Sequence, residues 1–512
     1  MLDRVGGTIP WGTDLAASVA EFGAAEAVHD GTRAIGLAEL AGRSARLALM
    51  LRERGVAPGT CVGLSLPNGI AAVWATNALR LAGVAEVGLN AGLTEAERRY
   101  CLDLSGTKLV ITAAAQAGAF RDLGCDVLAI EDVPDTAGDP AALPPVPGAA
   151  WAKIGFTSGT TGQPKAIVTT HAARWLANVL QRAHLSPMPG PGNRVLLMTP
   201  FIHGAGLIAH AFHDRGAGIV LLRGVDLDHV LPLLRAGTVD HLFAPPTVMA
   251  KIVGALGDER IDGLRCIFCG TAPLLPALYA KARAVFGAVV RVTYGKSEIV
   301  NPIAVLPPAA LDAYCAAPDG EGVCVGWPGT GVEIEIRDET GAVLAADAVG
   351  EVHLRGRHMS SGHIDASGFV PLPDDGFHAT GDLGRIDARG RLHLVGRLAD
   401  VVKSGGYKIH PDEIERELAG TAGTAAVAIV SLPSEYWGEV IVAVAETADP
   451  AWPDRARAAL AGLARYKHPR AFLLFPELPR NPQGKIMRRH IRTAILTRHR
   501  LIDGPHPVLE PI

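Results

Sequence analysis

The apolar and polar positions of the first hundred residues alternate between helical and extended spacing. Residues 37–53 place apolar side chains at helical intervals, and Gly55 follows as a candidate helix cap. Short apolar runs at residues 61–66 and 84–89 predict strands, and residues 69–82 between them predict a helix. A strand, a helix and a second strand in succession are typical of a mainly parallel sheet covered by helices.

The same kind of pattern continues along the rest of the chain. Short apolar runs predict strands at residues 154–156, 166–168, 195–198, 265–269, 289–293 and 350–356, and a hairpin that ends at residue 397. Beyond it, the pattern predicts a helix beginning at Pro411, strands at 425–431 and 440–446, a helix at 453–464 and a last strand at 470–475. The Pro-rich residues 133–150 predict a surface loop without an element.

The composition is that of an ordinary globular protein, and it excludes several classes of function. A length of 512 residues allows about three or four structural units. With 20% charged residues and a formal net charge of −4, neither a nucleic-acid surface nor a polybasic membrane anchor is expected. Residues 1–15 lack the apolar segment of a signal peptide, and polar residues interrupt residues 61–93, so no membrane span is predicted.

The cysteines favour a reducing compartment. There are seven of them, an odd number scattered along a long chain, and we therefore expect a cytoplasmic protein. Cys266 and Cys269 have the spacing of half a zinc site, but no second pair of cysteines or histidines at a suitable spacing accompanies them. Since they lie in an apolar run, buried strand cysteines are the favoured interpretation.

One polar loop between two predicted strands carries the strongest chemical signal. It contains Thr157, Ser158, Gly159, Thr160, Thr161 and Gly162, and Lys165 follows. Glycines let backbone N–H groups turn toward an anion, hydroxyls add donors, and a lysine adds a positive charge. The loop lacks the glycine–lysine–hydroxyl order of a Walker A loop and runs from strand to strand. It therefore predicts a polyphosphate site of another kind.

This loop resembles the phosphate-loop signature of the adenylate-forming superfamily, which includes acyl-CoA synthetases, luciferases and the adenylation domains of peptide synthetases. The resemblance implies an α/β fold in two domains. Residues 1–397 would form a large domain of stacked, helix-covered sheets that binds ATP and a carboxylate. Residues 398–512 would form a small, mobile α+β domain that carries the catalytic lysine. The family hinge falls two residues after Arg397, where this chain has Ala399 followed by Asp400.

Further motifs follow in the order of this family, and the resemblance implies their roles. The turn of Gly270, Thr271 and Ala272 would contact adenine and the acyl group. Tyr294, Gly295, Ser297 and Glu298 resemble a motif in which the tyrosine lies near adenine, the hydroxyl meets the α-phosphate and the glutamate holds Mg²⁺. Asp382 would accept the two ribose hydroxyls, and Arg397 would reach the ribose and phosphates.

Two positions bear on the substrate. His203 matches the family residue that borders and gates the acyl pocket, and it is a candidate catalytic residue. Amino-acid-activating relatives place an aspartate just after it to pair with the substrate ammonium, whereas this chain has Gly204. Because a buried ammonium without a counter-charge is costly, we expect a carboxylate that is not an α-amino acid. Lys296, unusual in its motif, points either to solvent or to a second anionic or polar group of the substrate.

The small domain contributes the remaining candidates. Lys485 lies in a Pro-x-Gly-Lys sequence and matches the catalytic lysine of the family. Lys403 matches a lysine that some members use in the second half-reaction, and Gly405 and Gly406 would line the pantetheine channel. Arg488 and the arginines after it would contact CoA phosphates or face solvent.

The resemblance implies ATP- and Mg²⁺-dependent activation of a carboxylate to an acyl-adenylate, release of pyrophosphate, and transfer to the thiol of CoA. One alternative keeps the activation but loads the phosphopantetheine thiol of a separate carrier protein, or uses a non-thiol acceptor such as an amine. A P-loop hydrolase or non-catalytic ATP-binding protein is disfavoured, because Walker motifs are missing while Glu298, Asp382 and Lys485 are present. Nucleic-acid partners are not expected, and a homodimer is plausible.

Overall fold

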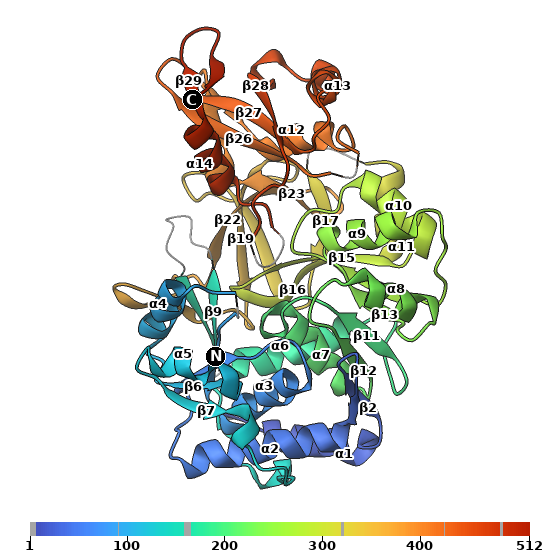
Figure 1. Ribbon diagram of the computed structural model, residues 1–512, viewed down its shortest axis with the longest axis vertical. Coiled ribbons are helices and arrows are strands. Elements are labelled where there is room, and N and C mark those ends of the chain that lie inside the picture. The colour runs from blue at the N-terminus through green and yellow to red at the C-terminus, as the bar shows by residue number, and fades with distance from the viewer. Residues whose placement is uncertain (1–6, 91, 158–164, 319–321, 424, 482–484) are drawn as a thin grey trace.

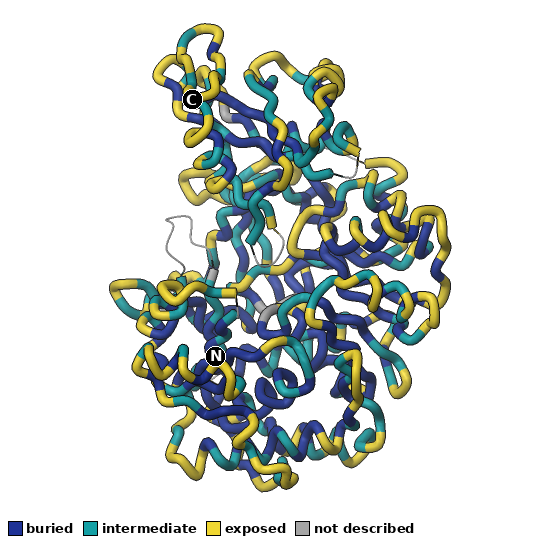
Figure 2. The backbone as a smooth tube through the Cα atoms, in the orientation of Figure 1, coloured by how far each residue is buried: buried dark blue, intermediate teal, exposed yellow. Residues whose placement is uncertain are grey.

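The computed structural model describes residues 7–90, 92–157, 165–318, 322–423, 425–481 and 485–512 (Figure 1). Two bodies of unequal size are stacked along the long axis, with the C-terminal part of the chain forming the smaller one. Figure 2 shows that buried backbone runs through the strands of both bodies, while exposed backbone covers the outside. This mixed α/β architecture agrees with the predicted fold class.

An eight-stranded sheet carries the predicted phosphate loop. Its order is β21-β20-β10-β9-β5-β4-β6-β7. The strands are β4 (Cys61–Ser65), β5 (Ala85–Gly88), β6 (Leu109–Thr112), β7 (Asp126–Ala129), β9 (Trp151–Thr157), β10 (Lys165–Thr170), β20 (Gly362–Asp365) and β21 (Gly368–Pro371). Strands β9, β5, β4, β6 and β7 are parallel, and the β9–β10 hairpin is antiparallel. Every residue of β4 is buried, as expected for a parallel strand covered on both faces.

A thirteen-stranded sheet holds most of the other predicted site residues. Its order is β18-β19-β22-β23-β17-β16-β15-β14-β13-β11-β12-β2-β3. The strands are β2 (Glu26–His29), β3 (Ala34–Gly36), β11 (Arg194–Leu197), β12 (Gly218–Leu221), β13 (His241–Phe243), β14 (Cys266–Cys269), β15 (Val290–Lys296), β16 (Ile299–Leu306), β17 (Val323–Pro328), β18 (Val332–Arg337), β19 (Gly350–Gly356), β22 (His378–Ile386) and β23 (Leu392–Arg397). From β2 to β15 neighbouring strands are parallel, and from β15 to β18 they are antiparallel.

Helices cover both sheets through continuous apolar faces. They are α1 (Trp11–Phe22), α2 (Leu37–Glu53), α3 (Ile70–Ala82), α4 (Glu95–Ser105), α5 (Ala117–Arg121), α6 (His171–His184), α7 (Gly206–His213), α8 (Leu227–Arg235), α9 (Pro246–Leu256), α10 (Pro276–Phe286) and α11 (Pro308–Ala316). The predicted helix over residues 37–53 is confirmed, and Gly55 follows it with a φ of +75°. Its repeating leucines form part of one large buried cluster with α3 and α7.

The smaller body has its own five-stranded sheet. It contains β24 (Val402–Ser404), β25 (Tyr407–Ile409), β26 (Val427–Ser434), β27 (Gly438–Glu446) and β28 (Ala471–Phe475). The helices are α12 (Pro411–Leu418), α13 (Trp452–Ala459) and α14 (Arg488–Arg498). Separate buried clusters with α12 and α13 in one and α14 in the other lie against this sheet, so the smaller body has a core of its own.

The structure corrects two details of the predicted elements. Residues 133–150 are not free of elements, since they contain the 3₁₀ turn η4 (Pro140–Ala142) and strand β8 (Val146–Pro147), which pairs with β1 (Thr8–Ile9). The strand at 470–475 is not the last, because β29 (His499–Ile502) and β30 (Val508–Pro511) form a hairpin after it. The mainly parallel sheet predicted from the first hundred residues is confirmed in the run β9, β5, β4, β6 and β7, and β-hairpins add antiparallel strands to both large sheets.

The β16–β17 pair lies in the antiparallel part of the larger sheet, one strand beyond its junction with the parallel part at β15, and Gly326 makes the close approach of these two strands possible. Gly326 has a φ of +91°, and a Cβ there would lie 2.0 Å from the Val305 carbonyl oxygen. We expect Gly326→Ala to lower the free energy of unfolding by about 2–4 kcal/mol, because left-handed strain and overpacking add. Urea denaturation of this variant measures the change. Gly254→Ala is the matched control, since its added methyl meets no atom within 4 Å. Equal urea midpoints for the two variants would contradict this account of the β16–β17 pair.

Candidate functional site

A cavity of about 990 Å³ lies where the two bodies meet. Polar and charged groups from both bodies line it, namely Thr271, Tyr294, Lys296, Asp382, Arg397, Asp412, Glu415, Lys485 and Arg488. Apolar residues of α9 and α10, such as Val253 and Leu278, form the opposite wall. Most of the charged groups come from four segments: the end of β15, the β22–β23 pair, α12 and the residues just before α14.

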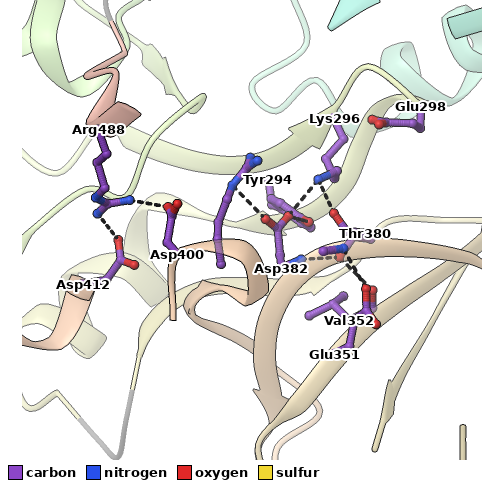
Figure 3. A network of polar contacts seen from close by, with 12 residues as sticks. Tyr294, Lys296, Glu298, Glu351, Val352, Thr380, Asp382, Asp400, Asp412 and Arg488 are labelled. Carbon is purple, nitrogen blue, oxygen red and sulfur yellow. Dashed lines mark hydrogen bonds and ion pairs between the residues drawn. The ribbon is translucent and has the colours of Figure 1, made fainter. Parts of the chain in front are cut away.

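Asp382 is a carboxylate of this cavity with three side-chain partners (Figure 3). Its Oδ2 accepts hydrogen bonds from the hydroxyl of Tyr294 and, at 3.1 Å, from Nζ of Lys296. Its Oδ1 lies 3.2 Å from Nε of Arg397, which is the register partner of Asp382 on β23. Burial alone would raise the pKa of Asp382, but Lys296 and Arg397 outweigh it, so that pKa lies below its usual value. Asp382 is therefore held as an anion.

Lys296 does not point to solvent, one of the two alternatives expected for it, but is part-buried and lines the cavity beside Asp382. Its side chain is 10% exposed, and its Nζ donates to the Thr380 carbonyl oxygen at 2.8 Å as well as to Asp382. The strand β15 runs on through Tyr294, Gly295 and Lys296, whereas the predicted strand ended at residue 293. The β15–β16 register is irregular between Tyr294 and Lys296, yet both side chains reach Oδ2 of Asp382.

Lys485 reaches the cavity from the smaller body, within the field of the charges on β22 and β23. Its side chain is exposed to the cavity, yet the surrounding walls still remove part of its hydration. This desolvation, reinforced by Arg397 and opposed by Asp382, lowers the pKa of Lys485 to about 8. The backbone N–H of Lys485 donates to the Asn481 side chain at 2.9 Å, and Pro482 to Gly484 of its motif lie outside the described residues.

Arg488 anchors the segment that carries Lys485. Its guanidinium pairs with Asp400, with Asp412 at 3.3 Å and with Glu415 at 2.8 Å. Burial raises the pKa of Glu415 to about 7, although Arg488 opposes that rise. The carboxylates raise the pKa of Arg488 against the effect of burial, so the guanidinium remains charged. This network joins the residue after the expected hinge to the lysine segment.

Glu298 lies in the turn between β15 and β16. The backbone N–H of Ser360 donates to its carbonyl oxygen at 2.7 Å, which fixes the turn, and Nε2 of His378 lies 3.9 Å from its carboxylate. Burial and Lys296 lower the pKa of His378, while Glu298 opposes them. No group of three or more His, Cys, Asp or Glu side chains that could hold a metal occurs among the described residues. A single carboxylate such as Glu298 is nevertheless sufficient for Mg²⁺, because this ion usually takes one protein carboxylate together with phosphate oxygens.

The turn of Gly270, Thr271 and Ala272 follows β14 and borders the cavity. Thr271 and Ala272 line it, and Gly270 is buried beside β15, where a Cβ would lie 2.7 Å from the Thr293 carbonyl oxygen. Thr271 has a φ of +68°, a left-handed conformation that is rare for a β-branched residue. Gly295 also lines the cavity, whereas Ser297 is exposed in the turn beside Glu298.

The phosphate loop lies at the end of the β9–β10 hairpin, which confirms its strand-to-strand position. Thr157 ends β9 and pairs in register with Lys165, which begins β10. Ser158, Gly159, Thr160, Thr161 and Gly162 lie outside the described residues, so their predicted contacts remain predictions. The side chain of His203 is likewise outside the described part, although its backbone belongs to the π-helix η5 (Phe201–Ala205).

Three candidates of the smaller body are not part of the cavity as it stands. Lys403, Gly405 and Gly406 are exposed at the β24–β25 hairpin and do not belong to the described residues that line the cavity. Gly405 and Gly406 have φ values of +57° and +83°, and a Cβ on Gly405 would meet the Trp437 ring at 2.9 Å. The structure thus brings Lys485, and not Lys403, to Asp382 and Arg397.

The sequence analysis missed three contributors, namely the pairing of Lys296 with Asp382, the position of His378 beside Glu298, and the anchoring of Arg488. Only the first had a signal in the sequence, because a lysine is unusual in that motif. The other two depend on contacts between residues about 80 positions apart, such as Asp400 with Arg488. The seven cysteines are all free, and Cys266 and Cys269 are buried in β14 as predicted. None of the helices within the described ranges has the length and apolarity to cross a lipid bilayer.

Comparisons with known proteins agree with this arrangement. A family model described as AMP-binding enzyme matches residues 15–364. The chain is 31% identical to feruloyl-CoA synthase of an Amycolatopsis species, over 91% of this chain and 95% of that protein. ATP-bound MatB from Rhodopseudomonas palustris superposes with a TM-score of 0.83 at 24% identity, over 94% of this chain and 98% of that one.

A third comparison is the amide bond synthetase McbA from Marinactinospora thermotolerans, with a TM-score of 0.81 and 25% identity over 94% of this chain and 99% of that one. The match of the family model to most of the chain, and the full-length similarity to a named CoA ligase, agree with the order of motifs and the cavity between two bodies. The chain therefore belongs to the family of AMP-binding enzymes, as an acid–thiol ligase related to the acyl-CoA synthetases.

Proposed function

We propose that this enzyme joins a carboxylate that is not an α-amino acid to the AMP moiety of ATP, releases pyrophosphate, and transfers the acyl group to the thiol of CoA. One observation carries the proposal. Asp382 and Arg397 of the larger body and Lys485 of the smaller body face one cavity, with Glu298 close by. Such a site can hold a ribose, a triphosphate and an attacking carboxylate together.

The chemistry of the first step explains why these groups are needed. A carboxylate is a poor electrophile, because its leaving group would be oxide. Attack of one carboxylate oxygen on the α-phosphorus forms a mixed anhydride and expels pyrophosphate. Negative charge accumulates as the two anions meet, and Lys485 and the phosphate loop would offset it. Mg²⁺, held by Glu298 and by phosphate oxygens, would add further positive charge there.

The cavity is compatible with two rigid bodies that move relative to each other. We place the boundary after Arg397, because β23 ends there in the larger sheet and β24 begins the smaller one at Val402. In the present arrangement Lys485 faces the cavity. A rotation about Leu398–Asp400 would withdraw it and bring Lys403 and the Gly405–Gly406 turn toward the site for thioester formation.

The substrate class is narrowed by two positions. Gly204 supplies no counter-charge for an α-ammonium group. Lys296, the candidate partner for a second anionic group of the substrate, is already engaged by Asp382 and Thr380. The segment that borders the expected acyl pocket contains Phe201 and Ile202, both buried in an apolar cluster with Phe268. We therefore favour aryl or aliphatic monocarboxylates over dicarboxylates.

The panel that tests this function combines purified enzyme, ATP and Mg²⁺ with aryl, fatty, dicarboxylic and amino acids, each with and without CoA. Pyrophosphate release is the readout. We expect release with an aryl or aliphatic acid, faster turnover with CoA, and none with amino acids. Release that CoA leaves unchanged would indicate a carrier-protein thiol or an amine acceptor, as the likeness to an amide bond synthetase allows. Release of phosphate instead of pyrophosphate would contradict the proposal.

Lys485→Ala should lower the rate of acyl-adenylate formation by about a hundredfold or more, because one preorganised charge in the transition state is lost. Thioester formation from a chemically prepared acyl-adenylate and CoA should be largely retained, since Lys485 would have left the site by then. Both half-reactions can be followed by mass spectrometry. Lys251→Ala, which alters an exposed lysine of α9, is the control. An adenylation rate equal to that of the control would refute the assignment of Lys485.

The pH dependence of adenylation should follow the lowered pKa of Lys485. The lysine acts as a cation, so the rate is highest while it is protonated and falls as the pH rises through about 8. The rate of thioester formation from acyl-adenylate should not show this fall as the pH rises through about 8. Initial rates of each half-reaction, measured from about pH 6 to about pH 10, test this difference. A basic limb that persists in Lys485→Ala would assign the titration to another group.

A further inference from the structure

We propose that Lys296 is a positioning residue of the nucleotide site. It holds Oδ2 of Asp382, so that Oδ1 of the same carboxylate faces the ribose diol. This inference rests on the proposed function, because it takes Asp382 as the ribose acceptor. It concerns a residue that is unusual at its position in the motif, and one that would act on the nucleotide only through Asp382. Each neighbour of Asp382 contacts one particular oxygen of its carboxylate.

The two oxygens of Asp382 have different kinds of partners. Oδ2 accepts from Tyr294, which is 8% exposed, and from Lys296, whose side chain is 10% exposed. Oδ1 has Arg397, whose side chain is 45% exposed, at 3.2 Å. Donors that are buried are costly to displace, whereas a half-exposed guanidinium can exchange its partner for water or ligand at little cost. Oδ1 is therefore the oxygen that a ligand can reach.

A carboxylate offers about four lone-pair positions, two on each oxygen. Tyr294 and Lys296 occupy those of Oδ2, and Arg397 occupies one of the two on Oδ1. When Arg397 turns away, both positions on Oδ1 become available to the two hydroxyls of a ribose. Lys296 thereby fixes the orientation in which Asp382 presents this oxygen to the cavity.

Lys296 is itself held from two sides, which makes it an effective anchor. Its ammonium donates to the Thr380 carbonyl oxygen at 2.8 Å, two residues before Asp382 on β22. The Thr380 hydroxyl in turn donates to the Val352 carbonyl oxygen at 2.7 Å and accepts from the backbone N–H of Asp382 at 3.0 Å. Figure 3 shows these contacts together, between Glu298 on one side and Tyr294 on the other. The ammonium thus ties the end of β15 to the backbone around Asp382.

The position also explains why a lysine suits the site. Asp382 is largely buried, and a buried carboxylate needs a charged partner in order to remain ionised and immobile. Arg397 can serve the carboxylate only while it is not engaged by a ligand. Lys296 also lines the cavity, but it binds Oδ2 and not the Oδ1 that a ligand would reach, so its contact can persist when a nucleotide is bound.

The test measures direct binding of ATP and of 2′-deoxy-ATP, each with Mg²⁺ and without acid or CoA, by calorimetry. For the unaltered enzyme we expect tighter binding of ATP by about tenfold, because one hydroxyl bonded to a charged acceptor is lost in the analogue. Lys296→Met should weaken ATP binding by about tenfold or more and reduce the preference for ATP to less than about threefold. Lys296→Gln, which retains a donor but not the charge, should be intermediate. Lys251→Met is the matched control.

A double-mutant cycle with Asp382→Ala separates positioning from a general structural effect. If Lys296 acts through Asp382, Lys296→Met should change ATP binding little once Asp382 is removed. Equal losses with and without Asp382, or an unchanged preference for ATP in Lys296→Met, would overturn the inference. If the unaltered enzyme does not bind ATP, the proposed function itself fails, and that result is distinct from either of these. Circular dichroism and urea denaturation of each variant identify any that do not fold.

Discussion

The arrangement of this enzyme depends on one electrostatic constraint, which is that a carboxylate must approach a triphosphate although both are anions. Positive groups have to surround the point where the carboxylate meets the triphosphate. They must not form ion pairs within the protein that are so tight that they can no longer stabilise this negative charge. The structure meets this constraint by dividing them between two bodies. Arg397 and Lys296 approach Asp382 from the larger sheet, and Lys485 approaches from the smaller body. The pair of Asp382 and Arg397 is fixed by the register of β22 and β23, whereas the approach of Lys485 depends on the relative position of the bodies.

The ion pairs around Arg488 bear on this division of positive groups between the two bodies, because they hold the segment that carries Lys485. Arg488 begins α14, three residues after Lys485, and binds Asp400 beside the expected hinge together with Asp412 and Glu415 on α12. Through it the lysine segment is tied to Asp400 and to α12. Burial, together with the neighbouring Asp412, raises the pKa of Glu415, and Arg488 opposes that rise. Most of the charges that hold the lysine segment also line the cavity, but they pair with one another and not with Asp382 or Arg397.

Much of this arrangement could be predicted from the sequence, for reasons that particular residues illustrate. The leucines of α2 and the apolar runs of β4 and β19 have periodicities that local patterns reveal. Asp382, Arg397 and Lys485 could be found because each lies in a motif at a strand end or turn. The partner of Lys296 could not be found, because that contact joins β15 to β22 across 86 residues. The short strand β8 was missed because two residues carry no periodicity, and it forms only where β1 supplies a partner.

The central claim is that a carboxylate oxygen attacks the α-phosphorus of ATP. The most direct measurement uses an accepted acid labelled with oxygen-18 in both carboxylate oxygens, with ATP, Mg²⁺ and CoA, followed by mass spectrometry of all products. The account predicts one labelled oxygen in AMP, one in the thioester, and none in pyrophosphate. Label in phosphate or pyrophosphate, with AMP unlabelled, would contradict it, because the acid would then have attacked a different phosphorus.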